Sequence, residues 1–157
     1  RTVVDDVWDL FEVFGSTVIY AGEIGQGTNL KLTVNLLLGN MMSAFAEALV
    51  FGTAHDLSPR DVLAAIQSGP VDSPLFRVKG ESILDRDFAP HFPAEKQHKD
   101  LTLALSAGGE AGVTLPQTAA ARETFSAAMA RGYAENDMNA VVRHLEETAG
   151  VEVVSDD

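Results

Sequence analysis

The sequence predicts an all-α domain built around one long central helix, with a short helix and a strand in front of it. Three observations support this class. The length of 157 residues suits one domain of ordinary size. Residues 29–55 contain no proline and are apolar nearly all round, as in a helix that other helices or a partner subunit enclose. Proline, glycine and capping residues divide the rest of the chain, after residue 55, into helix-length segments.

The first expected elements are a helix over residues 2–14 and a strand over residues 16–20. Apolar residues recur on one face of the helix, at Val3, Val4, Val7, Leu10, Phe11 and Phe14. The next segment is short and β-branched, as strands are. A lone strand lacks partners for its backbone groups, so a trimmed α/β domain is the expected source of this pair. The predicted division is a domain remnant (1–21), a helical domain (22–150) and a flexible tail (151–157).

Five further helices are expected after the long one, at residues 59–67, 74–84, 94–111, 116–131 and 137–150. Ser58 and Pro59 open the first of them as N-cap and first-turn proline. Gly132 ends the fourth, and Asn136 or Asp137 caps the last. Residues 87–93 hold two prolines and form a loop.

The chain is acidic, with 11 Lys and Arg against 23 Asp and Glu and a formal net charge of -12. This charge repels phosphate groups, so neither nucleic acid nor an anionic membrane is an expected partner. The long helix has the length of a membrane span, but Lys31, Asn35, Asn40 and Glu47 interrupt it, which favours the interior of a helical domain. The chain has no cysteine, which removes disulfides, thiolate catalysis and Cys-based zinc sites.

Three glycines, Gly22, Gly25 and Gly27, lie between the expected strand and the long helix, where a dinucleotide-binding loop could lie. From Gly25 onward the pattern lacks its third glycine. The acid about twenty residues further on, Glu47, falls inside the long helix and not at the tip of a second strand. We therefore reject a phosphate-binding loop and expect these glycines to let the backbone pass closely at a domain junction.

Lys31 and Asn35 form the sharper candidate pair, because a spacing of four places both side chains on one face of the long helix. Burial of a lysine among apolar residues lowers its pKa and makes proton transfer near neutral pH feasible. The residues alone still favour a structural role, in which the stem of the lysine packs and its head reaches water.

Two other patterns carry less information. Glu95-x-x-His98 matches half of a di-iron carboxylate site, but the second copy that such a site needs is missing, so no metal is expected. Lys99 and Asp100 lie within an expected helix, where they would form an ordinary exposed charge pair. Neither pattern indicates a function on its own.

The motifs gain meaning as a set. They are Gly22-x-x-Gly25-x-Gly27-x-x-x-Lys31-x-x-x-Asn35, Phe92, Lys99-Asp100-Leu101 and Leu115-Pro116. Together they resemble the β-hydroxyacid dehydrogenase family, which includes 3-hydroxyisobutyrate dehydrogenase, tartronate semialdehyde reductase and relatives of 6-phosphogluconate dehydrogenase. Within that family, residues 31–35, 41–47 and 92–100 most resemble the glyoxylate and succinic semialdehyde reductase branch.

The resemblance implies the helical C-terminal domain of the 6-phosphogluconate dehydrogenase type, with residues 1–21 left from an N-terminal Rossmann domain. It implies an NAD(P)-dependent oxidoreductase that interconverts a small aldehyde or keto acid and its hydroxyacid, with a substrate of the glyoxylate, succinic semialdehyde or 3-hydroxyisobutyrate type. NADP or NAD would be bound mainly by the missing domain, so this chain alone is expected to be inactive. A cytoplasmic homodimer or homotetramer is expected, with residues 22–150 as the domain that supplies the catalytic lysine and the dimer contacts.

The resemblance also implies roles for five residues. Lys31 would be the general acid/base, Asn35 would hydrogen-bond the substrate and Phe92 would wall its pocket. Asp100 would set the surroundings of the lysine, and Lys99 would lie on the cofactor side. The alternative is a non-catalytic helical assembly or interaction module, against which the presence of Lys31 argues.

Overall fold

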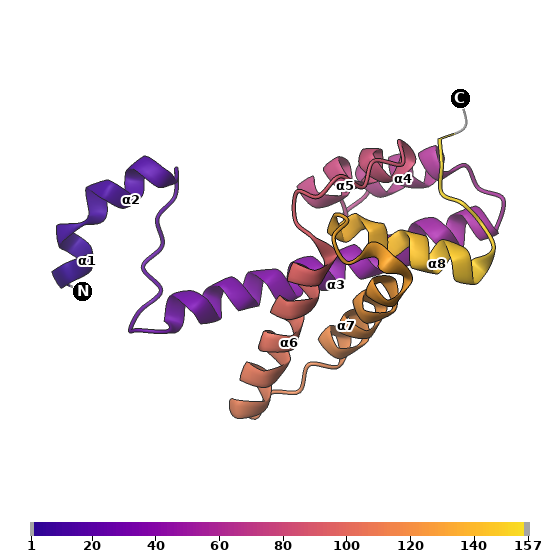
Figure 1. Ribbon diagram of the computed structural model, residues 1–157. Coiled ribbons are helices and arrows are strands. Elements are labelled where there is room, and N and C mark those ends of the chain that lie inside the picture. Colours follow the sequence, from indigo (N-terminus) through magenta and orange to yellow (C-terminus); the bar gives the residue numbers. More distant parts are fainter. Residues whose placement is uncertain (1, 156–157) are drawn as a thin grey trace.

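The computed structural model describes residues 2–155, and their fold is the expected all-α one around a single long helix (Figure 1). In chain order the elements are α1 (Thr2–Asp6), α2 (Trp8–Phe14), α3 (Gln26–Ala54), α4 (Pro59–Ser68), α5 (Pro74–Leu84), α6 (Ala94–Glu110), α7 (Pro116–Ala128), a π-helical turn η1 (Met129–Tyr133), a 3₁₀ turn η2 (Met138–Ala140) and α8 (Val141–Ala149). Most helix boundaries fall within a few residues of the expected ones.

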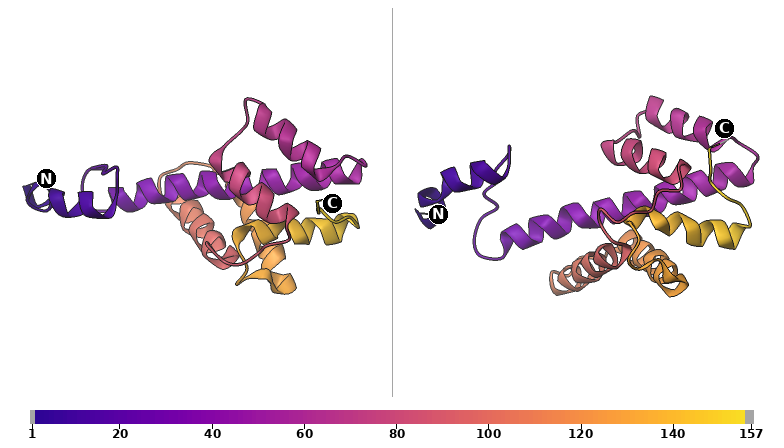
Figure 2. Two further views of the ribbon diagram at one scale, coloured as in Figure 1. Left: turned by 90° about the horizontal axis from the view of Figure 1, so that it is seen from above. Right: turned by 45° about the horizontal axis from the view of Figure 1, so that its top comes forward.

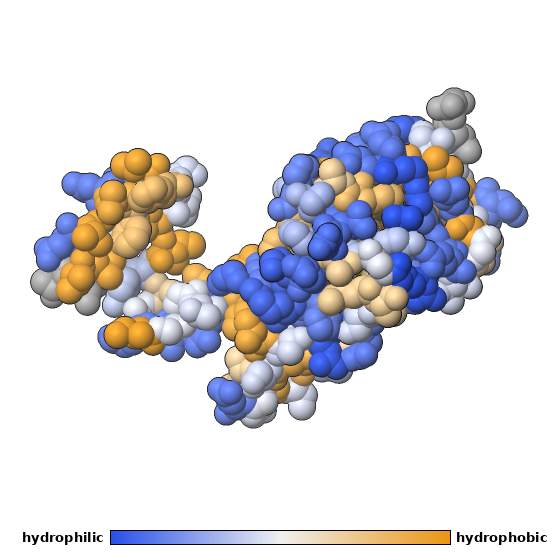
Figure 3. All heavy atoms as spheres, in the orientation of Figure 1, coloured by the Kyte–Doolittle hydropathy of each residue, from blue (hydrophilic) through white to orange (hydrophobic). Residues whose placement is uncertain are grey.

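The central helix α3 packs against α4, α5, α6, α7 and α8. The core lies where these helices meet, and its large buried side chains include Met42, Leu49, Leu63, Phe125 and Val141. The first turns of α3 extend toward α1 and α2 (Figure 2). By length and composition alone α3 could cross a membrane. Five helices pack against it, and the face of the bundle in Figure 3 is largely hydrophilic.

Local sequence explains where the helices begin. α4, α5 and α7 each start with a proline, whose fixed φ suits the first turn and whose missing N–H is not needed there. Ser73 caps α5 by accepting a hydrogen bond from Phe76 N at 3.3 Å. α3 begins at Gln26, ahead of the expected Asn29, because Gly25 with a φ of 96° turns the chain into the helix.

The N-terminal segment differs from the expectation in two ways. Residues 2–14 form two short helices with a break at Val7, which has a φ of -119° and a ψ of 12°. Residues 16–20 form no strand, and across residues 2–155 the only β-type pairing is an isolated bridge between Pro93 and Asp137. The predicted strand is wrong for this chain because its backbone finds no neighbouring strand with which to pair.

The prediction of a flexible tail is also wrong for residues 151–155, the part of the tail that the structure describes. Val153 is fully buried, and its N–H donates to Glu146 Oε1 at 2.8 Å. Ser155 N donates to Leu84 O at 3.2 Å, so the segment is tied to α5 as well as to α8. The apolar Val153 and these two hydrogen bonds outweigh the fraying expected of a terminus. The remaining residues of the predicted tail, 156 and 157, lie outside the described part.

Candidate functional site

The candidate site lies where α3 and α6 cross. The buried face of α6 carries Gln97, Asp100, Leu101 and Ala104, a spacing that aligns them along one side of the helix. Gln97 Nε2 donates to the backbone oxygen of Asn35 at 2.8 Å. A side chain on Gly39 would collide with the Gln97 amide and would come within 2.9 Å of Leu101 Cδ2. The absence of a side chain at Gly39 therefore allows α6 to approach α3.

This crossing gathers three of the predicted site residues around the carboxylate of a fourth, Asp100. Asp100 is 1% exposed, and its Oδ2 accepts hydrogen bonds from Lys31 Nζ at 3.0 Å and from Asn35 Nδ2 at 2.6 Å. Lys99 Nζ lies 3.1 Å from Oδ1 of the same residue. Asp100 is therefore an ion-paired, buried anion and not one member of an exposed surface pair, as its local sequence suggested.

The surroundings keep Asp100 ionised. Burial raises the pKa of its carboxyl group, but the hydrogen bonds from Lys31, Asn35 and Lys99 outweigh burial and hold the pKa below its usual range. Two ammonium groups against one carboxylate leave the cluster positively charged in an acidic chain. Such a site attracts a small anion.

Lys31 itself is less enclosed than the sequence predicts. Its side chain is 56% exposed. The hydrogen bond to Asp100 holds Lys31 Nζ in a fixed position. The remaining hydrogens of Nζ face outward from Asp100.

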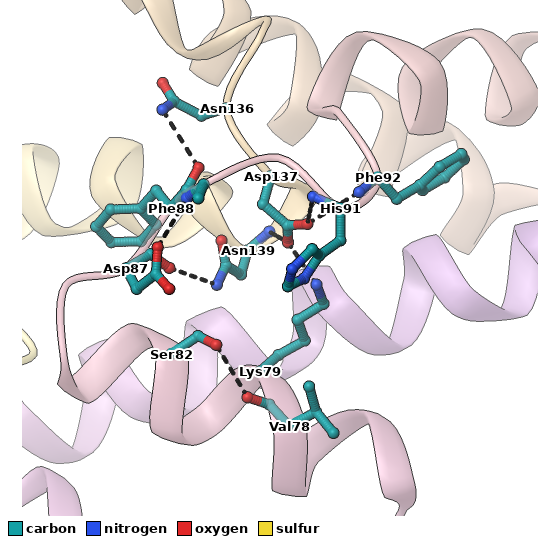
Figure 4. Close-up of polar contacts among 11 residues, drawn as sticks. Val78, Lys79, Ser82, Asp87, Phe88, His91, Phe92, Asn136, Asp137 and Asn139 are labelled. Atoms are coloured by element: carbon teal, nitrogen blue, oxygen red, sulfur yellow. Dashed lines mark hydrogen bonds and ion pairs between the residues drawn. The ribbon is translucent and has the colours of Figure 1, made fainter.

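Phe92 is not one of the partners of Asp100, and its backbone is anchored by a second buried ion pair, Lys79–Asp137. Its side chain packs against the core, and its N–H donates to Asp137 Oδ2 at 3.0 Å. Asp137 also accepts hydrogen bonds from His91 N at 3.0 Å and Asn139 N at 3.2 Å, and it binds Lys79 Nζ at 2.7 Å (Figure 4). The loop that leads into α6 is therefore anchored to α5 and η2.

Asp137 was foreseen from the sequence only as a possible helix cap. It does cap η2, but its larger contribution is to pair with Lys79 across 58 residues of chain. Burial raises the pKa of Asp137, and the hydrogen bonds from Lys79, Phe92 N and Asn139 N outweigh it and lower the pKa overall. A lysine inside an amphipathic helix gives no local signal that it will be buried.

The Glu95-x-x-His98 pattern takes no part in a shared site. Glu95 pairs with Lys96 at 2.8 Å, while His98 Nε2 lies 2.9 Å from Ser126 Oγ. Burial, together with the nearby Arg122, lowers the pKa of His98. Within residues 2–155, no three His, Asp or Glu side chains lie close enough together to hold a metal ion.

Comparisons with known proteins found relatives that match most of this chain. The model of a family described as "NAD-binding of NADP-dependent 3-hydroxyisobutyrate dehydrogenase" matches residues 25–145. The chain is 39% identical over 132 residues to glyoxylate/succinic semialdehyde reductase 1 of Arabidopsis thaliana. That match covers 84% of this chain and 46% of the relative. It is 38% identical over 154 residues to 2-(hydroxymethyl)glutarate dehydrogenase of Eubacterium barkeri. That match covers 98% of this chain and 51% of the relative.

A solved structure supports the fold. The crystal structure of 3-hydroxyisobutyrate dehydrogenase from Salmonella typhimurium superposes with a TM-score of 0.84 at 22% identity, covering 89% of this chain and 50% of that one. The chain thus spans about half the length of the curated relatives and the solved structure that it matches.

Proposed function

The chain belongs to the 3-hydroxyisobutyrate dehydrogenase family, and on that premise we propose that it is the proton-transferring domain of an NAD(P)-dependent oxidoreductase. The reaction interconverts a small aldehyde or keto acid and its hydroxyacid. The observation that supports this most is the meeting of Lys31, Asn35 and Lys99 at the buried Asp100 carboxylate.

In this proposal Lys31 is the general acid/base. During reduction the carbonyl carbon receives hydride while the carbonyl oxygen takes a proton from Lys31 Nζ, and oxidation runs the same transfer in reverse. Asp100 fixes Nζ by its 3.0 Å hydrogen bond, so the reacting proton has a defined position. Asn35 donates one amide hydrogen to Asp100. Its second amide hydrogen and its oxygen remain available for the substrate.

A nicotinamide cofactor would supply the hydride, and the positive charge of the cluster suits its phosphates. Lys99 is the residue of this chain that we assign to the cofactor, because its side chain is 56% exposed and reaches out from Asp100. The same positive charge favours a substrate that carries a carboxylate, as glyoxylate and succinic semialdehyde do. Phe92 would form an apolar wall, carried by the loop that Asp137 anchors.

We also propose which domain completes the enzyme. α2 exposes Leu10, Val13 and Phe14, which need an apolar cover. We therefore keep residues 1–21 as part of a Rossmann domain that binds most of the NADP or NAD. The complete enzyme would be a cytoplasmic homodimer or homotetramer.

Substitution of Lys31 in the complete enzyme tests the proposal. Lys31→Ala should lower turnover by roughly 10²- to 10⁴-fold, the usual effect of a lost acid/base, without unfolding the protein because the side chain is exposed. Lys96→Ala is the matched control, since Lys96 is an exposed lysine on α6 that pairs with Glu95, away from Asp100. Near-normal turnover of Lys31→Ala would remove Lys31 from the mechanism.

A panel of glyoxylate, succinic semialdehyde and 3-hydroxyisobutyrate, assayed with the complete enzyme, would identify the substrate. Each compound is assayed with the NADP and the NAD couple. We expect turnover of at least one member. The non-catalytic assembly module, which is the alternative function, predicts no turnover for any of them.

A further inference from the structure

A pocket of about 430 Å³ lies among η1, α8, the turn after α5 and the segment that follows α8. Its volume falls in the range of small-molecule pockets, roughly 300–1,000 Å³. The pocket shares no wall residue with the cluster around Asp100. Its walls include one aromatic and five charged side chains: Tyr133, Arg86, Arg143, Glu146, Glu147 and Glu152. We call it the Arg143 pocket.

Two of the three glutamates in the Arg143 pocket are already paired with cations of the chain. Arg86 donates to both carboxylate oxygens of Glu146, at 2.6 and 3.1 Å. Glu147 pairs with Arg131 at 2.8 Å and accepts a hydrogen bond from the Tyr133 hydroxyl. These two carboxylates therefore have their counter-charges within the fold.

The guanidinium group of Arg143 has no such partner. Its central carbon lies over two rings, 4.1 Å from the centre of Tyr133 and 5.4 Å from that of Phe88. Among residues 2–155 its nitrogens make no hydrogen bond and no ion pair. Stacking on a ring leaves the N–H edge of a guanidinium group open, and this edge matches the two oxygens of a carboxylate. The fold therefore positions a cation at the pocket without supplying its anion.

Glu152 is the loosely held anion of the same pocket. Its side chain is 65% exposed and lies 3.4 Å from Arg86, which binds Glu146 more closely. With Arg131 included, three arginines balance three glutamates, so the pocket as a whole is neutral. A phosphate group, with up to two negative charges, would be repelled by the three carboxylates. A ligand with one carboxylate and one ammonium group would instead satisfy both Arg143 and Glu152.

We propose that the Arg143 pocket binds an amino acid in its zwitterionic form. The carboxylate of the ligand accepts hydrogen bonds from the Arg143 guanidinium group, and its ammonium group donates to Glu152. Binding requires neither Lys31 nor a nicotinamide cofactor. It can therefore be measured on the 157-residue chain itself, whatever reaction the complete enzyme catalyses.

Isothermal titration calorimetry with the wild-type chain tests the chemistry of the ligand. Glycine, β-alanine and 5-aminopentanoate hold the two charges at increasing distances, and acetate, propionate and pentanoate are their counterparts without the ammonium group. At least one of the amino acids should bind with a Kd below about 1 mM and roughly 10-fold more tightly than its counterpart. Absence of binding by all three, or equal binding of the counterparts, overturns the proposal.

Two variants test which side chains hold the ligand. Arg143→Gln should weaken binding of the best amino acid roughly 10- to 100-fold, because the charge-assisted hydrogen bonds are lost. Glu152→Gln, at an exposed side chain, should abolish the preference for the amino acid over its counterpart and leave the fold intact. Arg77→Gln is the matched control, since Arg77 is 58% exposed, pairs with Asp72 and does not line the pocket.

Circular dichroism shows whether each variant is folded. Unchanged affinity in Arg143→Gln, or an equal loss of affinity in Arg77→Gln, would mean that the amino acid binds elsewhere and would overturn the proposal. An unchanged preference in Glu152→Gln would overturn it as well, even if Arg143→Gln failed to fold.

Discussion

Replacement of Asp137 by Asn removes one charge from the most deeply buried ion pair in the described structure. Asp137 is 1% exposed and receives Lys79 Nζ at 2.7 Å together with the N–H groups of His91, Phe92 and Asn139. Asparagine has nearly the same shape, but it has one acceptor oxygen instead of two and no charge. The variant therefore leaves a buried ammonium without its counter-charge and at least one donor without an acceptor.

The expected loss is large relative to the stability of a domain. The loss of one partner of a buried ion pair costs about 3–5 kcal/mol, and this range includes much of the penalty for the unpaired donor. We expect Asp137→Asn to lower the free energy of unfolding by about 4 kcal/mol, where whole domains have about 5–15 kcal/mol. Lys79→Met in the same chain should restore part of this loss, because no buried charge is then left unpaired.

Urea unfolding followed by far-ultraviolet circular dichroism measures these differences. The pKa of Asp137 is lowered in the folded protein, so its contribution is complete above the ordinary carboxyl pKa and disappears as the pH falls through the lowered value. The deficit of Asp137→Asn should therefore shrink in acid. A loss below about 1 kcal/mol at neutral pH, the size of an exposed pair, would refute the structural role given to Asp137.

Three further substitutions test the core and the site. Gly39→Ala should destabilise the chain by about 1–3 kcal/mol in urea unfolding, because the new methyl group meets Gln97 and Leu101; an unchanged midpoint would mean that α6 can move away. Phe125→Ala should cost about 3–5 kcal/mol in the same assay, since the ring is fully buried. Asp100→Asn in the complete enzyme should lower turnover roughly 10²-fold through misplacement of the lysine. Because the pKa of Asp100 is lowered, wild-type turnover should keep this contribution down to acidic pH, and a normal turnover of the variant would contradict the role of Asp100.

Local chemistry predicted the fold better than it predicted the contacts. Pro74 and Leu84 bound α5 as the sequence indicated, because a first-turn proline and a serine cap act within a single turn. The strand over residues 16–20 was wrong because strand formation depends on a neighbour, which no local pattern encodes. Val153 was placed in a frayed tail because its burial depends on α8 and α5, far away in the sequence.

The candidate site shows the same division. The spacing of Lys31 and Asn35 placed both on one helical face, and the resemblance to a known family added Asp100 and Lys99. The convergence of all four depends on how α6 crosses α3, which Gly39 and Gln97 determine through a contact between distant segments. The exposure of Lys31 could not be foreseen either, since it depends on how α6 packs against α3.

The segment over residues 151–155 fastens α5 and α8 from a position beyond the last helix. A ribosome delivers these residues after every helix described here, so a product that stops at residue 150 would contain all the helices. In that product Glu146 would lose the N–H of Val153, Leu84 would lose that of Ser155, and the core would lose the side chain of Val153. Helical content would then be nearly normal while α5 and α8 loosen, and proteases that cleave loose helices would recognise the incomplete product.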